Sequence, residues 1–208
     1  MELTHDQQSK QLGEEAIMNL KTQHTFHIDL QHHLIGEVRY VPSPNQDARP
    51  NEQDLSLIVI HGISLPPGQF GGKGVEQLFT NQLDEREDLY YAEIAHLKVS
   101  AHLFIQRSGD LTQFVPFNRR AWHAGVSCFK GREACNDFSI GIELEGMDAT
   151  PYTASQYQTL TAVIKALKLA YPSLKQQPIL GHCDIAPNRK TDPGPYFMWS
   201  AIEALNQS

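Results

Sequence analysis

The run LSLIVIHGI, residues 55–63, constrains the fold of this chain more than any other segment. Its nearly continuous apolar side chains, several of them β-branched, are typical of a strand that is buried on both faces. Strands of this kind belong to sheets covered by other elements on each side, so the run predicts a covered sheet. The strand also carries a histidine near its end, His61, and leads into the glycine- and proline-containing loop SLPPGQFGG.

Other segments supply partners for this strand. SAHLFI and LTQFV, joined by the turn RSGD, predict a hairpin with Gly109 at the turn. FSIGIELEG, residues 138–146, predicts a second inner strand with its isoleucines and Leu144 on one face and its polar residues on the other. A brief apolar run at residues 178–180 predicts one more strand. Inner strands together with a hairpin predict a mixed sheet.

A long helix is predicted to begin after Thr153, which fits a capping box with Gln156. Its apolar residues fall on one stripe at three- and four-residue steps: Tyr157, Leu160, Ile164, Leu167 and Tyr171. Pro172 ends this helix, and a closing helix is predicted over Tyr196 to Leu205. These elements predict a mixed α/β fold, in which a central mixed β-sheet is flanked by helices in a single domain.

Residues 1–36 differ in character from the rest of the chain. They are polar, carry one predicted helix from Asp6 to Leu20, and end in a stretch rich in histidines. These histidines have no acidic or cysteine partner in register, so we interpret them as part of a solvated N-terminal extension. The folded domain is then expected to occupy residues 37–208.

Charge and cysteine content limit the class of protein. A formal net charge of −7 argues against a nucleic-acid partner. No apolar run approaches the roughly 20 residues that span a bilayer, and the N-terminus does not resemble a secretory signal, so no membrane association is expected. The odd number of cysteines, three, favours reduced thiols and a cytoplasmic location, although Cys128 and Cys135 are able to pair.

The segment GHCDIAPNRKTDPGP, residues 181–195, carries the strongest chemical signal. Its prolines and glycines exclude a helix interior or a central strand, so it is predicted to be an ordered loop. His182 offers a nitrogen and Asp192 an oxygen, both ordinary zinc ligands. Lys190 lies two residues before the carboxylate, where it can reach negative charge that develops on a substrate. The segment therefore predicts part of a metal site.

A catalytic zinc usually has three protein ligands, so one more is needed. His61 fits best because it lies at the end of a strand beside a glycine-rich loop, although a histidine bonded to a backbone carbonyl fits the same pattern. A general base is expected on the polar face of the strand at residues 138–146. Glu143 and Glu145 share that face, so periodicity alone leaves both as candidates.

The tetrapeptide Trp122-His123-Ala124-Gly125 is unusual because it places a tryptophan and a histidine beside two small residues. This combination suits a wall that receives a flat or sugar-like ligand. His123 is also a rival metal ligand.

Seven segments, in one order, together resemble the AmpD-type N-acetylmuramoyl-L-alanine amidases. This family belongs to the zinc amidase superfamily, which includes phage lysozymes and peptidoglycan-recognition proteins. The resemblance covers Val41 to Ala204 and rests on VPSPN, VIHGISLPPGQFGG, HLKVSAHLFI, RRAWHAGVS, CNDFSIGIELEG, YTASQYQ and GHCDIAPNRKTDPGP. It implies the zinc amidase fold and hydrolysis of the amide between 1,6-anhydro-N-acetylmuramic acid and L-alanine in recycled cell-wall muropeptides.

The resemblance also implies a role for each residue of the site. Zn²⁺ would be bound by His61, His182 and Asp192. Glu143, rather than Glu145, would serve as the acid/base, and Lys190 would stabilise the oxyanion. The muropeptide is then the expected small-molecule partner, and no obligate protein partner is expected.

Substrate binding is less well defined by the resemblance. We expect it to involve Trp122, His123, Lys98 and Arg132. The chain has Gly62, Lys98 and Ala134 where relatives often have asparagine, arginine and arginine. The lysine lacks the bidentate fork of arginine, and the alanine removes a cation that Arg132 or Lys130 would replace.

Two alternatives remain at this stage. The first is a phage or periplasmic amidase that acts on intact peptidoglycan. The second is a muropeptide-binding module without catalysis, which would lack a metal ligand or a catalytic partner. All five expected positions are filled here, which favours the enzyme.

Overall fold

The computed structural model describes residues 25–203, and its centre is a six-stranded mixed sheet with the strand order β12-β5-β11-β6-β7-β3. The strands of this sheet are β3 (Arg39–Tyr40), β5 (Leu57–Ile63), β6 (Leu103–Ile105), β7 (Leu111–Gln113), β11 (Ser139–Glu145) and β12 (Ile179–Gly181). Three two-stranded pairs lie around it: β1 (Ile28–Asp29) with β2 (Leu34–Ile35), β4 (Gln46–Ala48) with β8 (Arg119–Ala121), and β9 (Cys128–Phe129) with β10 (Arg132–Glu133).

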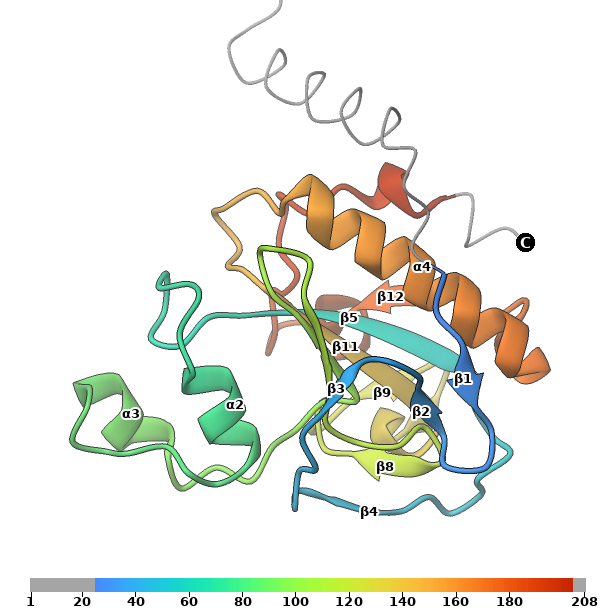
Figure 1. Ribbon diagram of the computed structural model, residues 1–208, viewed down its shortest axis with the longest axis horizontal. Coiled ribbons are helices and arrows are strands. Elements are labelled where there is room, and N and C mark those ends of the chain that lie inside the picture. The colour runs from blue at the N-terminus through green and yellow to red at the C-terminus, as the bar shows by residue number, and fades with distance from the viewer. Residues whose placement is uncertain (1–24, 204–208) are drawn as a thin grey trace, which may run out of the picture.

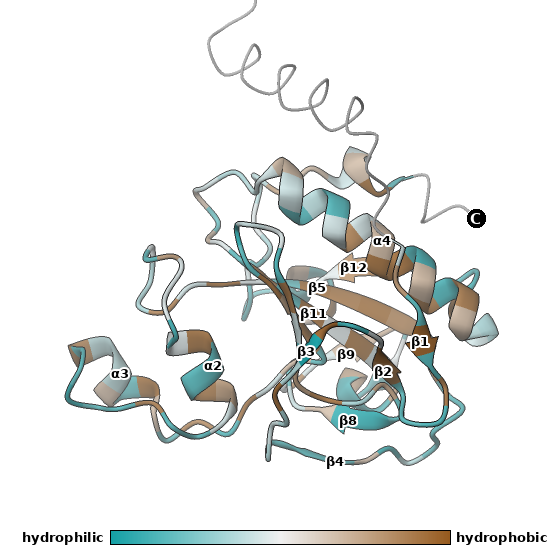
Figure 2. Cartoon of the chain, in the orientation of Figure 1, coloured by the Kyte–Doolittle hydropathy of each residue, from teal (hydrophilic) through white to brown (hydrophobic). Residues whose placement is uncertain are grey.

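The strand directions confirm the predicted mixed α/β class. β12, β5, β11 and β6 run parallel to one another, and β7 returns antiparallel to β6 as the predicted hairpin. Gly109 lies at the turn with φ of +92°, a value that favours glycine. β5 is apolar along most of its length, whereas β4 and β8 at the lower rim are hydrophilic (Figure 2).

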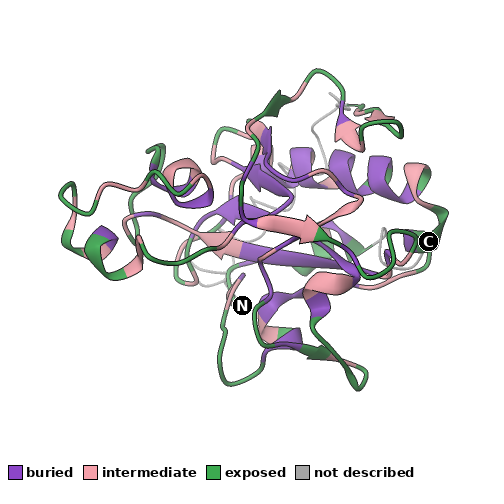
Figure 3. Cartoon of the chain, turned by 90° about the horizontal axis from the view of Figure 1, so that it is seen from below, coloured by how far each residue is buried: buried purple, intermediate pink, exposed green. Residues whose placement is uncertain are grey.

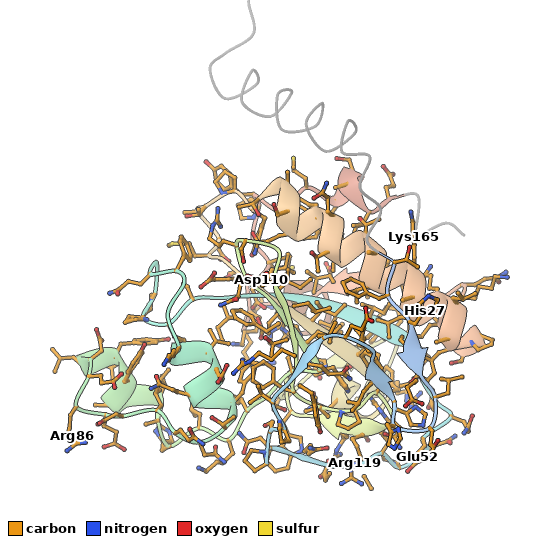
Figure 4. The ribbon with its side chains drawn as sticks, viewed as in Figure 1. His27, Glu52, Arg86, Asp110, Arg119 and Lys165 are labelled. Carbon is orange, nitrogen blue, oxygen red and sulfur yellow. The ribbon has the colours of Figure 1, made fainter. Side chains whose placement is uncertain are left out.

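Helix α4 (Ala154–Ala170) covers one face of the sheet (Figure 1). It begins at the predicted capping box, and its apolar stripe packs on Ile140, Ile142 and Leu144 of β11. Lys165, on the same helix, is exposed and labelled in Figure 4. The helix is therefore amphipathic, with its apolar stripe facing the sheet as the sequence predicts.

The opposite face of the sheet is covered by short elements and loops. Leu57 and Val59 of β5 pack there against Ala124, Phe138 and Ile185. A third apolar cluster joins the hairpin to α2 (Gly74–Phe79) and α3 (Leu89–Ile94), which lie together at one side of the molecule (Figures 1 and 3). No helix among residues 25–203 is both long enough and apolar enough to cross a bilayer.

Three local features differ from the sequence-based expectation. The segment after β12 begins with a one-turn helix, α5 (His182–Ile185), because Asp184 accepts a hydrogen bond from the Gly181 amide at 2.7 Å. The closing helix is wrong over residues 196–202, where the 3₁₀ turn η3 (Trp199–Ala201) forms instead, and Glu203 is the one described residue of the predicted span that is α-helical. Helices α2 and α3 were not predicted. Two further 3₁₀ turns are η1 (Cys135–Asp137) and η2 (Pro172–Leu174).

The expected helix at Asp6 to Leu20 lies outside the described residues. The described part of the expected extension, residues 25–36, folds back as the β1–β2 pair. Ile35 is buried in the main core, and the His33 Nδ1 lies 2.8 Å from the Tyr171 hydroxyl. This part of the extension therefore packs on the domain, and the boundary between residues 36 and 37 stays a prediction.

The capping box gives a direct test of this fold. Replacing Thr153 with alanine removes the acceptor for the Gln156 amide and the hydrogen bond from the Thr153 hydroxyl to the Arg107 carbonyl, at 2.7 Å. We expect the free energy of unfolding, measured by urea denaturation, to fall by about 1–2 kcal/mol. Thr161→Ala, in the middle of the same helix, is the control and should not destabilise, because alanine has the higher helix propensity.

Candidate metal centre

Three neighbouring parallel strands bring the candidate site together at their carboxyl ends. His61 of β5 pairs directly with Glu143 of β11 in the register of the sheet. On the other side of β5, Gly181 pairs with Ile60, and His182 follows immediately. The carboxyl ends of parallel strands are where α/β proteins place their ligands. The topology thus brings His61 beside His182, which is 121 positions away in sequence.

The donor atoms of His61, His182 and Asp192 form a nearly equilateral triangle. The two Nδ1 atoms are 3.0 Å apart, and Asp192 Oδ2 lies 3.2 Å from the Nδ1 of His61 and 3.1 Å from that of His182. Both histidines are buried, and Asp192 is half-buried. This group is a candidate metal site.

The segment after α5 holds Asp192 against the two histidines. The backbone carbonyl of Asp192 accepts a hydrogen bond from the amide of Cys183, near the start of the one-turn helix, at 3.0 Å. The next carbonyl, that of Pro193, accepts one from the Tyr152 hydroxyl at 2.9 Å. The Tyr152 hydroxyl also occupies the space that a side chain at Gly62 would enter. Tyr152 is therefore a support of the site that the sequence alone does not reveal.

The surroundings of His61 and Asp192 favour the protonation states that bind a cation. Burial lowers the pKa of His61 to about 4, so this imidazole is neutral at pH 7 and needs no proton loss to bind a metal. Burial acts to raise the pKa of Asp192, but its close polar contacts with His182 and His61 outweigh burial and hold this pKa well below its usual range. A carboxylate and a neutral imidazole are the forms that ligate metals.

Glu143 is the unpaired carboxyl of the site. Its Oε1 lies 3.9 Å from the His61 Nδ1, and its Oε2 is buried without a hydrogen-bond partner among the described residues. Burial raises the pKa of Glu143 well above its usual range, the charge of Asp192 raises it further, and the charge of Lys190 opposes both. A buried carboxyl with such a shift and a free oxygen is suited to accept and return a proton.

Glu145 lies on the same face of β11 but has a different environment. Its Oε1 accepts a hydrogen bond from the Gly71 amide at 2.5 Å, and its Oε2 accepts one from the Arg107 amide at 3.0 Å. Both oxygens are thus engaged in holding loops that follow β5 and β6. This difference favours Glu143 as the candidate base.

Lys190 lies on the exposed surface of the segment between α5 and Asp192. Its positive charge acts on the pKa of both Glu143 and His61, lowering each. The Lys190 ammonium is therefore electrostatically coupled to the candidate base and to the triad.

A comparison with known families decides the class of this site. The family model for N-acetylmuramoyl-L-alanine amidase matches residues 51–195, which include His61, Glu143, His182 and Asp192. The chain belongs to the N-acetylmuramoyl-L-alanine amidase family.

Individual relatives agree with this assignment. The amidase is 56% identical over 172 residues to the 1,6-anhydro-N-acetylmuramyl-L-alanine amidase AmpD of Escherichia coli, a match that covers 83% of this chain and 93% of the relative. A crystal structure of an AmpD derivative superimposes with a TM-score of 0.81 at 54% identity, covering 86% and 98% of the two chains. The Escherichia coli amidase AmiD, solved with anhydro-N-acetylmuramic acid-L-Ala-D-gamma-Glu-L-Lys, is more distant, with a TM-score of 0.55 at 27% identity over 78% and 61% of the chains. The predicted AmpD-type family and amidase fold are confirmed.

The amidase does not gather all of the predicted substrate-binding residues at the triad. Arg132 pairs with Asp54 at 2.6 Å and stacks on Phe138, and both partners lie just before the amino ends of β5 and β11, at the other end of the sheet. Lys98 is exposed on the segment between α3 and β6. Their roles in binding stay predictions.

Trp122 and His123 point in different directions in the amidase. The Trp122 indole donates to Asp47 at 3.1 Å and is half-buried, so a role in binding stays a prediction. His123 corrects the expectation of an open wall, because only 8% of it is exposed and both of its ring nitrogens have protein partners. Its ring lies behind His61, on the side away from the other two candidate ligands.

Proposed function

We propose that this amidase hydrolyses the amide bond between 1,6-anhydro-N-acetylmuramic acid and L-alanine in soluble muropeptides, as part of cell-wall recycling. The observation that carries the proposal is the triangle of His61, His182 and Asp192 with the unpaired carboxyl of Glu143 beside it. The choice of substrate is supported by the AmpD relative, which shares 56% identity over 93% of its own length.

We infer that the metal of this site is Zn²⁺. Tetrahedral zinc with bonds of about 2.0–2.2 Å to nitrogen and oxygen separates its ligand atoms by about 3.3–3.6 Å. The three donor atoms here are 3.0–3.2 Å apart, so a small shift of each would accommodate the ion. Two imidazoles and one carboxylate also match the three protein ligands of a catalytic zinc site, with a fourth position left for water or substrate.

The proposed mechanism assigns one task to each group. When bound, Zn²⁺ would supply a Lewis acid that polarises water and the scissile carbonyl. Glu143 would take the proton of the attacking water and later return it to the amine of L-alanine as that amine leaves. The Lys190 ammonium would stabilise negative charge that develops on the carbonyl oxygen. Burial of Glu143 supports this role, since a carboxyl with a raised pKa is a better proton carrier near neutral pH.

We also propose that the amidase works in the cytoplasm. This is supported by the three cysteines, all of which are free thiols in the structure, including the exposed Cys128 and the buried Cys135. Free thiols of this kind are typical of a reducing compartment.

A substrate comparison tests the proposed function. We expect the purified amidase to convert a defined 1,6-anhydro-muropeptide into the anhydro sugar and a free peptide, identified by mass spectrometry. Treatment with a chelator should abolish this conversion, and added Zn²⁺ should restore it, because the proton transfers of Glu143 need the polarised water. Intact sacculi should release peptide much more slowly.

Two outcomes would contradict this proposal in different ways. Rapid digestion of sacculi without preference for the anhydro sugar would indicate an amidase of intact peptidoglycan. Binding of the muropeptide without any product would indicate a recognition module instead of an enzyme. Conversion that persists in the chelator would argue against a metal at the triad.

A further inference from the structure

A series of hydrogen bonds between buried side chains leads from His61 into the interior of the protein. His61 Nε2 lies 2.9 Å from His123 Nδ1, and His123 Nε2 lies 3.2 Å from the Ser139 hydroxyl. That hydroxyl donates to the Cys135 carbonyl at 2.5 Å. His61 and Ser139 are almost completely inaccessible to solvent, and His123 is 8% exposed. This series of hydrogen bonds begins at the candidate metal ligand His61 and ends at the backbone carbonyl of Cys135.

The end of this series determines the direction of every hydrogen bond in it. A carbonyl oxygen only accepts, so the Ser139 hydroxyl must donate its proton to Cys135. Ser139 is then the acceptor for His123, whose Nε2 carries the proton. His123 Nδ1 is left with a lone pair, and it accepts from His61 Nε2. His61 consequently presents its Nδ1 lone pair to Asp192 and His182.

The other candidate histidine ligand, His182, contacts Ala124, the residue that follows His123. His182 Nε2 lies 3.1 Å from the carbonyl oxygen of Ala124, which only accepts, and 3.4 Å from Arg189 Nη2, which already donates to that carbonyl at 2.6 Å. The shorter contact, with the carbonyl, favours a proton on His182 Nε2. The backbone amides of His123 and Ala124 both donate to the side-chain oxygen of Asn136, at 3.1 and 2.8 Å. The dipeptide His123-Ala124, held by Asn136, thus contacts the Nε2 atoms of both candidate histidine ligands, His61 and His182.

The sheet is shaped to admit the His123 ring. Gly141 lies on β11 between Ser139 and Glu143, and a Cβ atom at this position would collide with the ring. The His123 and His61 rings meet edge-on, with centroids 5.0 Å apart and an interplanar angle of 85°. A glycine in the middle of an inner strand weakens that strand, so its presence here marks a close approach by a neighbouring group.

We propose that His123 is a positioning residue that fixes the tautomer and orientation of the zinc ligand His61, and does not bind substrate. The inference rests on the zinc site of the proposed function. Ligating histidines usually donate their second N–H to a carboxylate, a carbonyl or water. Here the acceptor is a neutral imidazole, which orients the ligand without adding negative charge to the site. His123 acts on the metal only through His61.

Two replacements of His123 separate positioning from packing. Phenylalanine keeps a ring in the space over Gly141 but offers no acceptor to His61. Asparagine fills less space but can place its side-chain oxygen near the position of Nδ1. We expect His123→Phe to raise the zinc dissociation constant by about 10- to 100-fold, the effect typical of losing such a partner, and His123→Asn to stay close to the parent. The constant is measured by chelator competition on metal-free protein, and thermal melting without zinc monitors folding.

The reverse ranking, or an equal loss in both variants, would overturn the proposal and indicate packing alone. Two serine variants provide an independent measurement if either His123 variant does not fold. Ser139→Ala should weaken zinc binding, because it removes the acceptor that sets the His123 tautomer. Ser127→Ala is the matched control: it also removes a buried hydroxyl, one bonded to Gly125 and Cys135, outside the series of hydrogen bonds that leads to His61. Equal zinc affinity in the two serine variants would also overturn the proposal.

This test distinguishes its own failure from that of the proposed function. The parent protein, assayed in parallel for zinc binding and for muropeptide hydrolysis, reports on the proposed function alone. A parent that binds zinc and hydrolyses the muropeptide, with His123→Phe binding zinc as tightly, would leave the proposed function standing and refute the role of His123. A parent without zinc affinity would refute both.

Discussion

Replacing His182 with alanine is expected to abolish zinc retention and amidase activity together. The variant leaves two of the three donor atoms, and it also breaks the 3.1 Å contact that helps to orient Asp192. The loss of zinc affinity should exceed the roughly 10- to 100-fold effect of removing only a hydrogen-bond partner of a ligand. Zinc content after dialysis and the rate of muropeptide hydrolysis are the two measurements.

His96→Ala is the matched control for this prediction. His96 is exposed on the segment that follows α3, so its removal should change neither zinc content nor rate. A His182→Ala protein that still held one zinc per chain would contradict the proposed ligand set. Retained activity without zinc would contradict the proposed role of the metal.

Glu143→Gln should have a large effect on the rate and little effect on the metal. Glutamine has nearly the same shape but cannot accept the proton of the attacking water, and general acid–base catalysis typically contributes about 10²- to 10⁴-fold. We therefore expect kcat to fall within this range while zinc content stays at the parent value. The structure supports the separation, since Glu143 Oε1 is 3.9 Å from the His61 Nδ1, farther than any contact within the triad.

Glu133→Gln, on the exposed strand β10, is the control for the loss of a carboxylate charge. An active Glu143→Gln protein would refute the base assignment. A variant that lost zinc in parallel with activity would indicate that Glu143 holds the metal site together and does not act as its base.

Much of the fold and of the site follows from local sequence pattern. The apolar run of β5, the alternating pattern of β11 and the capping box of α4 are strong signals, because burial and helix capping leave recognisable sequence patterns. His61 and His182 could be proposed as ligands since each lies at or just after the end of a predicted strand. Parallel pairing then brings these ends to one edge of the sheet.

Features that depend on distant contacts could not be predicted in this way. Only the fold shows that both oxygens of Glu145 accept hydrogen bonds from the amides of residues 71 and 107, while Glu143 Oε2 has no hydrogen-bond partner within residues 25–203. The closing helix fails because the Met198 amide donates to the Tyr157 hydroxyl at 2.7 Å, and Gly194 has φ of +82° just before it. Helices α2 and α3 have six residues each, too short for a clear period, and they depend on packing around Tyr91 and Phe79.

The depth of His123 is the clearest example of this limit. A tryptophan and a histidine in sequence suggest an exposed recognition surface, but neighbouring residues on an extended chain point in opposite directions. One sequence signal for its true position is Gly141, a glycine in the middle of an inner strand. That signal indicates a close approach without identifying the group that approaches.

Because His61 pairs directly with Glu143, the β-sheet itself sets the distance between these two residues of the proposed active site. Adjacent strands are about 4.8 Å apart, so the distance between the proposed ligand and the proposed base is set by backbone hydrogen bonds and not by flexible loops. A slip of one residue between β5 and β11 would bring Ile142 or Leu144 opposite His61 and turn Glu143 toward α4. The same ladder of hydrogen bonds therefore stabilises the sheet and sets the spacing between the proposed ligand and the proposed base.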